Sequence, residues 1–440
     1  MTSDASSFVN RWNQAQSYVA LDDLDTLPRP TSWREEGIMV GSPPPAEKRV
    51  SRTQLTRYPF SNWAFQNVRS LFPTANVPRG NGSIVPLPAS QPHLAQLRFS
   101  DVTGKSWSLD EFQRTSYADA LLVMHRGRLV HEFYNNDQHG GRPHLLNSAS
   151  KSFTGLLVDL LVGDGQLDYA RPASDYVPAL AGSGYGDATV EQLHDMTVAI
   201  DYDRSGPAIS TTSTVTTQGQ YFIAMGLVPR PEGYEGPEST LDALPHIGKS
   251  TEGVEHGYGF SYQTPNTDTL AWIVRMASGE SLSALLSDRI WSRLGAESDA
   301  YYMVDPAGID IAAAGLNAAP RDLARFGMML ANGGDHNGDQ VLPERVIDRV
   351  FSGGDRDTFR RRGYPRNQGP AVAGYAYRGQ WWLPDLAGNP ILARGMFGQR
   401  LFVDRVSDIV VVQLSTCPMP DNSVEPGHLA MYEAIVREFS

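Results

Sequence analysis

The segments with the clearest strand pattern lie in two groups on either side of a long helical stretch, and this arrangement limits the folds available to the chain. The first group, ADALLVMHRGRLVHEFY (118–134), reads as two strands joined at Arg126-Gly127, and therefore as a hairpin. The second group comprises GYAYRGQWWL (374–383), QRLFVD (399–404) and DIVVVQLS (408–415). We predict that the later strands complete a sheet that the hairpin begins.

Helical periodicity begins at Ser148 and continues until Gly163 ends the element. The apolar residues that recur at helix spacing in this segment are Phe153, Leu156, Leu157 and Leu160. Further helices are predicted at TVEQLHDM (189–196), at PRDLARFGMMLANGG (320–334) and in the last residues of the chain.

The chain is predicted to have three parts and an α+β fold. Residues 1–98, rich in proline, glycine and polar residues, are expected to form an arm wrapped on the core. Residues 99–165 and 331–440 are expected to form an α/β domain with a mixed antiparallel sheet flanked by helices. Residues 166–330 are expected to form an inserted, mainly helical domain. With 440 residues, such a chain can enclose a deep site.

Composition excludes several classes of function. The formal net charge is −12, and no basic stripe with interleaved aromatic residues occurs, which argues against a nucleic-acid partner. No apolar run approaches the length of a membrane span, and residues 1–25 lack the pattern of a secretion signal, so we expect a cytoplasmic protein without membrane contact. The single cysteine, Cys417, is read as a buried thiol. The assembly state stays open, with a homodimer as one option.

The tetrapeptide Ser148-Ala149-Ser150-Lys151 places a hydroxyl and an amine three residues apart at the predicted helix start. Residues at this spacing share a helix face, so the two groups come within hydrogen-bonding range. A serine hydroxyl becomes a good nucleophile only when another group takes its proton. The pattern is frequent by chance and usually marks a capped helix start, so other motifs must support a catalytic interpretation.

Two groups are candidates to take the Ser148 proton. One is a neutral Lys151 amine, although lowering a lysine pKa from about 10.4 to near 7 costs roughly 4–5 kcal/mol. The other is a tyrosine phenolate held by a cationic Lys151. Tyr262 is the candidate tyrosine, because it directly precedes a predicted helix that ends at Gly279 and can project into a cleft. Asn266 is interpreted as the N-cap of that helix.

A third motif, Ala393-Arg394-Gly395-Met396, precedes a predicted strand. Gly395 would let a substrate approach the backbone closely, and the next amide, that of Met396, could donate to a developing oxyanion. A simple turn between strands is the alternative. Trp381, with its neighbours Trp382, Tyr375 and Tyr377, either lines an apolar pocket or fills a core.

Metal and nucleotide sites are not supported. DHNGD (335–339) has the spacing of the start of a calcium loop but lacks the later glycine and glutamate, and is read as a polar turn. The GKS at 248–250 lacks the first glycine of a phosphate loop, because Ala243 stands there. The ten histidines include no HExxH pair. We therefore predict no metal and no cofactor.

The order of Ser-x-x-Lys, tyrosine and a glycine-containing strand resembles that of the serine β-lactamase and penicillin-binding-protein superfamily. Within its class C and esterase-like branch, the sequence is most similar to the 6-aminohexanoate-dimer (nylon oligomer) hydrolases. This similarity is carried by SNWAFQNVRSLFPTANV (61–77), SYADALLVMHRG (116–127), SASKS (148–152), NTDTLAWIV (266–274) and FGQRLFVD (397–404). The resemblance implies the fold of the β-lactamases and DD-peptidases.

The resemblance also implies roles for individual residues. Ser148 corresponds to the nucleophile, Lys151 to its proton partner, and Tyr262 to the base in acylation and the acid toward the leaving group. The backbone amides of Ser148 and Met396 correspond to the oxyanion hole.

Two departures argue against β-lactamase activity. Thr264 replaces the asparagine of the class C Tyr-x-Asn pattern, and Ala393-Arg394-Gly395 replaces Lys-Thr-Gly. Arg394 could still attract an anionic group if it faces the cleft. We therefore predict a serine hydrolase that cleaves amide or ester bonds of a small molecule through an acyl-enzyme on Ser148. An acyltransferase and a non-catalytic ligand-binding protein of the same fold are the alternatives.

Overall fold

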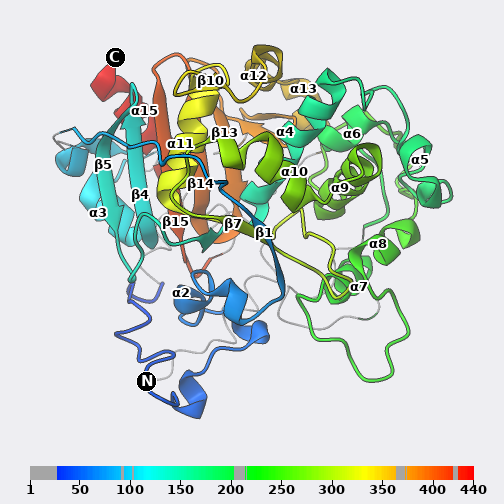
Figure 1. The fold of residues 1–440 in the computed structure, drawn as a ribbon, viewed down its shortest axis with the longest axis horizontal. Coiled ribbons are helices and arrows are strands. Elements are labelled where there is room, and N and C mark those ends of the chain that lie inside the picture. The colour runs from blue at the N-terminus through cyan, green and yellow to red at the C-terminus, as the bar shows by residue number, and fades with distance from the viewer. Residues whose placement is uncertain are drawn as a thin grey trace.

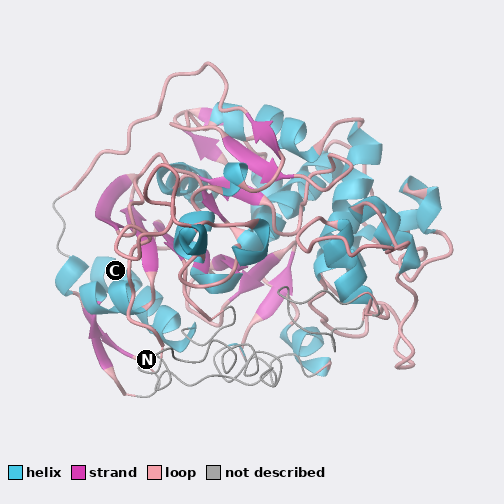
Figure 2. Cartoon of the chain, turned by 90° about the horizontal axis from the view of Figure 1, so that it is seen from below, coloured by secondary structure: helices cyan, strands magenta, loops and turns pink. Residues whose placement is uncertain are grey.

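The computed structural model describes residues 27–90, 94–101, 104–202, 214, 216–362, 372, 374–419 and 425–440. Residues 1–26, on which the expectation about a secretion signal rests, lie outside this range. The described part contains two larger antiparallel sheets and a set of helices beside and across them (Figures 1 and 2).

A seven-stranded antiparallel sheet lies at the centre of the α/β part (Figure 1). Its strands are β4 (Ala118–His125), β5 (Arg128–Tyr134), β11 (Ala376–Arg378), β12 (Trp381–Leu383), β13 (Ile391–Gly395), β14 (Gln399–Asp404) and β15 (Ile409–Ser415). Their order is β11-β12-β13-β14-β15-β4-β5. β15 pairs with β4 along its whole length, so the C-terminal strands continue the sheet that the hairpin begins. The predicted sheet is confirmed.

Both faces of this sheet are buried, which explains its long apolar runs. Helix α11 (Pro320–Ala331) packs on one face, and α15 (Glu425–Phe439) covers the other. Val410 and Val412 belong to the core beneath α11, whereas Ile409 and Val411 belong to the core beneath α15. Alternate residues of a strand point to opposite faces, so burial of both faces requires apolar residues at every position.

A group of helices lies beside the sheet, on the right of Figure 1. It comprises α4 (Ser150–Gly163), α5 (Ala173–Tyr176), α6 (Val190–His194), α7 (Thr217–Ala224), α8 (Thr240–Ala243), α9 (Thr264–Ser278) and α10 (Leu282–Arg289). Gly279, after α9, has a φ of 75°, a left-handed conformation that glycine adopts without strain, and it ends the helix where the sequence predicts. The described residues also form the helices α2 (Ser61–Ala64), α3 (Leu109–Thr115), α12 (Glu344–Phe351) and α13 (Arg356–Arg361).

A second, four-stranded antiparallel sheet was not predicted. It joins β1 (Thr74–Val77), β7 (Ala300–Met303), β8 (Leu316–Ala318) and β6 (His144–Leu145) in that order. These strands have two to four residues, too few to show a period of two in the sequence. The range expected to be mainly helical therefore also holds two strands, and α11, which begins within it, packs on the large sheet. The division into three domains remains a proposal.

Helix α4 lies very close to the turn between β11 and β12. A Cβ atom at Gly155 would lie 2.1 Å from the backbone oxygen of Gly379, so only glycine allows this approach. The Ser152 hydroxyl donates to the backbone oxygen of Gln380 at 2.8 Å, and the Gln380 side chain accepts from the Thr267 hydroxyl at 2.8 Å. These contacts fix α4 and α9 against the edge of the sheet.

Candidate active site

Ser148 lies in a single 3-10 turn, Asn147–Ala149, directly before α4, as the helical pattern predicts. Asn147 has a φ of 48°, in the left-handed region that asparagine tolerates better than most residues. The Ser150 hydroxyl donates to the Asn147 oxygen at 2.6 Å, and the Leu146 amide donates to the Leu316 oxygen at 2.9 Å. The turn is thus held by the helix that follows and by the small sheet.

Lys151 points back from the first turn of α4 toward Ser148. Its Nζ donates to Ser148 Oγ at 2.9 Å and to the backbone oxygen of Ala313 at 2.8 Å. The lysine is 1% exposed, whereas Ser148 is half-buried. A hydroxyl and an amine at this separation can exchange a proton directly.

Tyr262 faces the same amine. Lys151 Nζ lies 5.1 Å from the centroid of the Tyr262 ring. That ring packs at 5.2 Å against Trp382 and at 6.2 Å against Tyr377, both centroid to centroid. The structure therefore brings together Ser148, Lys151 and Tyr262, although the tyrosine is far from the other two in sequence.

The N-cap prediction for Asn266 is wrong. Helix α9 begins at Thr264, with Gln263 as the capping residue, and Asn266 is fully buried inside the first turn. Its side-chain nitrogen lies 3.5 Å from the sulfur of Met196. The cause is Pro265, which occupies an early position of the helix, where a missing N–H is tolerated, instead of preceding the helix.

A carboxylate that the sequence analysis missed lies behind Lys151. Asp268 of α9 accepts a hydrogen bond from the Ala313 amide at 3.2 Å and another from the Tyr221 hydroxyl. Ala313 thus links the two charges, with its amide on Asp268 and its carbonyl on Lys151. Burial raises the pKa of Asp268 to about 6, and the Tyr221 hydroxyl and the Lys151 charge oppose that increase. The available signal was an acidic residue within the otherwise uncharged NTDTLAWIV.

Ser148 opens into a cleft of about 680 Å³, including the part open to solvent. Its lining residues are Arg52, Thr53, Leu55, Thr56, Leu145, Asn147, Ser148, Phe222, Met225, Leu227, Thr264, Met303, Ala314 and Met396. Most of the walls are apolar. Among the described residues that line the cleft, Arg52 alone carries a charge. A mainly apolar cleft with a few polar groups is typical of small-molecule sites.

The Ala393–Met396 motif lies before the predicted strand, now β14, as expected, but Gly395 also ends a strand of its own, and Met396 begins the short turn between the two strands. The strand Ile391–Gly395 was missed in the sequence, and Met396 follows it at the cleft. A Cβ atom at Gly395 would lie 2.2 Å from the Leu146 oxygen, so glycine is required for the approach of the Ser148 turn. The Asn147 side-chain amide donates to the Met396 oxygen at 3.3 Å and ties the two segments together.

Arg394 and Trp381, the two candidate substrate-binding side chains from the sequence, do not line this cleft. Arg394 is 5% exposed, and its guanidinium lies 4.5 Å from the Trp382 ring centroid and 5.6 Å from that of Tyr375. Trp381 is fully buried in the larger core. The two side chains lie on opposite faces of the sheet, and both are buried because both faces are covered.

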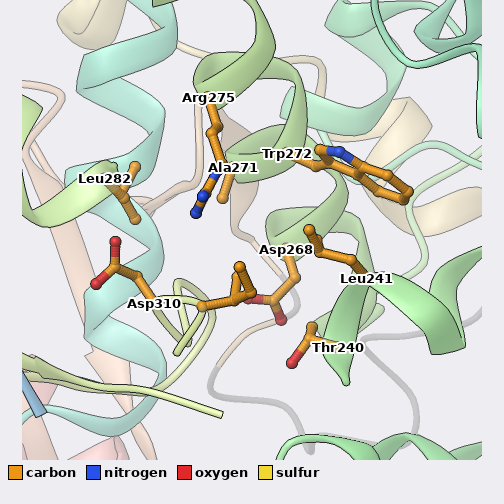
Figure 3. Close-up of a pocket in the computed structure, with 9 residues that line it drawn as sticks. Thr240, Leu241, Asp268, Ala271, Trp272, Arg275, Leu282 and Asp310 are labelled. Carbon is orange, nitrogen blue, oxygen red and sulfur yellow. The ribbon is translucent and has the colours of Figure 1, made fainter. Parts of the chain in front are cut away.

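A smaller pocket reaches Asp268 from outside the Ser148 cleft (Figure 3). It is lined by Thr240, Leu241, Asp268, Ala271, Trp272, Arg275, Leu282, Ile309 and Asp310. None of these residues lines the Ser148 cleft, whereas Ala314, next to Ala313, does. The Asp268–Ala313 contact therefore lies between the two pockets.

A second buried polar cluster lies farther along α4. Asp159 accepts from the Tyr169 hydroxyl, and the Arg349 guanidinium lies 3.4 Å away. Burial raises the pKa of Asp159 to about 7 despite this cation. His194, 3.7 Å from Asp159, has a pKa lowered by burial to about 3, so the histidine is neutral at pH 7 and forms no ion pair. No residue of this cluster lines the Ser148 cleft.

Among the residues that the structure describes, no three His, Cys, Asp or Glu side chains gather as a metal site. Within the same residues, no helix has the length and apolar character needed to span a bilayer.

The sequence profile of the β-lactamase family, described simply as "Beta-lactamase", matches residues 113–434. This range contains Ser148, Lys151, Tyr262 and the whole large sheet. The chain belongs to the β-lactamase family.

Two members of this family resemble the chain over most of its length. The 6-aminohexanoate-dimer hydrolase of Paenarthrobacter ureafaciens is 32% identical over 364 residues, which cover 82% of this chain and 87% of the relative. A solved structure from Bacillus anthracis, assigned as a 6-aminohexanoate-dimer hydrolase, has a TM-score of 0.79 at 30% identity and covers 90% of this chain and 98% of its own. The resemblance inferred from the sequence is confirmed.

This β-lactamase-family protein is therefore a hydrolase related to the 6-aminohexanoate-dimer hydrolases. EstCE1, described as a hydrolase with promiscuous acyltransferase activity, has the same fold, with a TM-score of 0.52 at 15% identity over 72% of this chain and 93% of its own.

Proposed function

We propose that the protein cleaves carboxylic amide or ester bonds of small molecules through an acyl-enzyme on Ser148. The observation that carries this proposal is the 2.9 Å contact between Lys151 Nζ and Ser148 Oγ at the wall of an apolar cleft. The kinship with 6-aminohexanoate-dimer hydrolases adds support for an amide substrate.

The proposed reaction has two steps. Ser148 Oγ attacks the carbonyl carbon, and its proton passes to Tyr262 or Lys151. The backbone amides of Ser148 and Met396 donate to the oxyanion. Tyr262 then protonates the leaving amine or alcohol, and the acyl group stays on Ser148. A water molecule, deprotonated by the same groups, attacks the acyl-enzyme, releases the acid and restores the Ser148 hydroxyl.

Intact-protein mass spectrometry tests this mechanism. Wild type and Ser148→Ala are exposed briefly to a p-nitrophenyl short-chain ester while nitrophenolate release is followed, and the linear 6-aminohexanoate dimer is then tried as an amide. We expect a transient acyl adduct with turnover in the wild type and neither in Ser148→Ala, with the two proteins melting at similar temperatures. Turnover that survives in Ser148→Ala would exclude Ser148 as the nucleophile. An adduct that is released only to an added amine or alcohol would instead indicate an acyltransferase.

A further inference from the structure

A short segment of concentrated positive charge stands beside the cleft of this acidic protein. Residues 48–57 hold four cations, Lys48, Arg49, Arg52 and Arg57, and no carboxylate, in a chain whose net charge is −12. None of the four forms an ion pair with any residue that the structure describes. We call residues 48–57 the basic segment. Cations without an ion-pair partner raise the local concentration of anions.

Arg52 is the member of the basic segment that lines the cleft with Ser148. Its Nε donates to the backbone oxygen of Leu71 at 2.6 Å, and its guanidinium lies 5.2 Å from the Phe72 ring centroid. These contacts orient the Arg52 side chain while using only Nε as a hydrogen-bond donor. Among the described residues, nothing accepts a hydrogen bond from its two terminal nitrogens, and the residue is exposed. A guanidinium held in this way can bind a carboxylate through two parallel hydrogen bonds.

The cleft between Arg52 and Ser148 suits a hydrocarbon chain. Leu55, Phe222, Met225 and Leu227 contribute apolar side chains to its walls. Such walls stabilise methylene groups by removing their surface from water, at about 25 cal/mol per Å². A substrate that fits this cleft therefore has an apolar chain, with a charge only where Arg52 can meet it.

We propose that Arg52 is a specificity-determining residue that selects substrates with a carboxylate separated from the scissile bond by a methylene chain. The other cations of the basic segment attract the same anions from solution. This inference rests on the proposed function, because it requires that Ser148 be the reacting group. The carboxylate can belong either to the acyl group or to the leaving group, and the two positions are distinguished by experiment.

Two matched substrate pairs test the proposal. The first pair, p-nitrophenyl hexanoate and mono-p-nitrophenyl adipate, differs by a carboxylate on the acyl side. The second pair, N-hexanoyl-hexylamine and N-hexanoyl-6-aminohexanoate, differs by a carboxylate on the leaving-group side. For each pair, the ratio of kcat/KM for the charged member to that for the neutral member is measured in the wild type, Arg52→Met, Arg52→Lys and Arg57→Met. Arg57→Met is the matched control, because it removes the same charge from the same segment outside the cleft lining.

We expect the wild type to favour the charged member of at least one pair, and the pair that responds identifies where the carboxylate lies. Arg52→Met should lower that ratio by about threefold to fivefold, the effect of one partly exposed charge contact. Arg52→Lys should keep part of the preference, and Arg57→Met should change it less than Arg52→Met. Raising the salt concentration to about 0.5 M should reduce the wild-type ratio, because salt screens exposed charges.

The inference alone would be overturned by turnover of all substrates with no preference for charge, or by a preference that survives in Arg52→Met. An equal effect of Arg57→Met would also overturn it, since general charge would then replace a local contact. Absence of turnover for all four substrates would overturn the proposed function as well. Melting temperatures identify any variant that has lost its fold, and Arg52→Lys keeps the test decisive if Arg52→Met unfolds.

Discussion

Two buried aspartates in this protein have closely matched surroundings. Asp268 accepts a hydrogen bond from the Tyr221 hydroxyl, and Asp159 accepts one from the Tyr169 hydroxyl. Burial raises the pKa of both, to about 6 for Asp268 and to about 7 for Asp159. By carboxylate chemistry alone, either cluster qualifies as a functional site.

The cations beside the two aspartates differ. Lys151, near Asp268, can lose a proton and touches the hydroxyl of Ser148, whereas Arg349, near Asp159, stays charged at every physiological pH. The raised pKa of a carboxyl group therefore indicates only that the group is buried. A titratable amine in contact with a hydroxyl at a cleft is the feature that favours the Ser148 cluster as the catalytic one.

Replacing the two cations should give the largest contrast between the clusters. Lys151→Met is expected to lower kcat on a p-nitrophenyl ester by about 1,000-fold or more, because Ser148 loses its proton partner. Arg349→Met should change kcat by less than about threefold, because it contacts no reacting group. Steady-state kinetics on both variants decide the matter, and a severe loss of kcat in folded Arg349→Met would show that the second cluster also serves catalysis.

Replacing Tyr262, the tyrosine beside Lys151, should have the next largest effect. Tyr262→Phe is expected to lower kcat on an amide by about 100-fold, since the leaving amine needs a proton. The loss on a p-nitrophenyl ester should be smaller, because nitrophenolate leaves without protonation. Tyr169→Phe, in the other cluster, is the control. Equal losses on amide and ester would remove the acid role from Tyr262.

Neutralising Asp268 should have a moderate effect that depends on pH. Because the pKa of Asp268 is about 6, its carboxylate is ionised above that pH and stabilises positive charge on Lys151. We expect wild-type kcat/KM to fall as pH decreases through about 6, and Asp268→Asn to be about tenfold slower at neutral pH without this decline. A pH–rate profile measures both. An unchanged acidic limb in Asp268→Asn would assign that limb to another group.

Neutralising Asp159 should affect stability more than activity. The folded-state pKa of Asp159 is about 7, above the ordinary value of 3.8, so the folded protein binds this proton more tightly than the unfolded chain does. The stability that this proton contributes is therefore fully present below about pH 3.8 and is lost as pH rises from there through about 7. Between pH 5 and pH 8, the stability of Asp159→Asn should increase by about 3 kcal/mol relative to that of the wild type, with kcat little changed. Denaturant unfolding at the two pH values provides the measurement, and a constant difference in stability would contradict the assignment.

The parts of the fold that were predicted depend on local pattern. The hairpin at 118–134 and the strand at 399–404 show in the sequence because their residues alternate or run apolar over a full strand length. Ser148 and Lys151 were predicted together because their spacing alone places them on one helix face. Tyr262 was found from its position before a helix and from the order of the motifs.

The parts that were missed depend on contacts between distant segments. Asp268 meets Lys151 through Ala313, a pairing that no local pattern encodes. Gly395 was expected to admit substrate, but it admits the backbone of Leu146, which only the three-dimensional arrangement reveals. Arg52 lies in a segment without periodicity, so its position at the cleft had no local signal.

The basic segment lies outside residues 113–434, the range that matches the β-lactamase family profile, yet it supplies part of the cleft wall. The groups proposed to break the bond and the residue proposed to choose the substrate are thus encoded in separate stretches of the gene. Mutation or exchange of the basic segment can alter substrate preference while the residues proposed to break the bond stay intact. Relatives that share the groups proposed to react can therefore differ in the substrates they accept. Mutant libraries confined to residues 48–57 are a compact route to variants with new substrates.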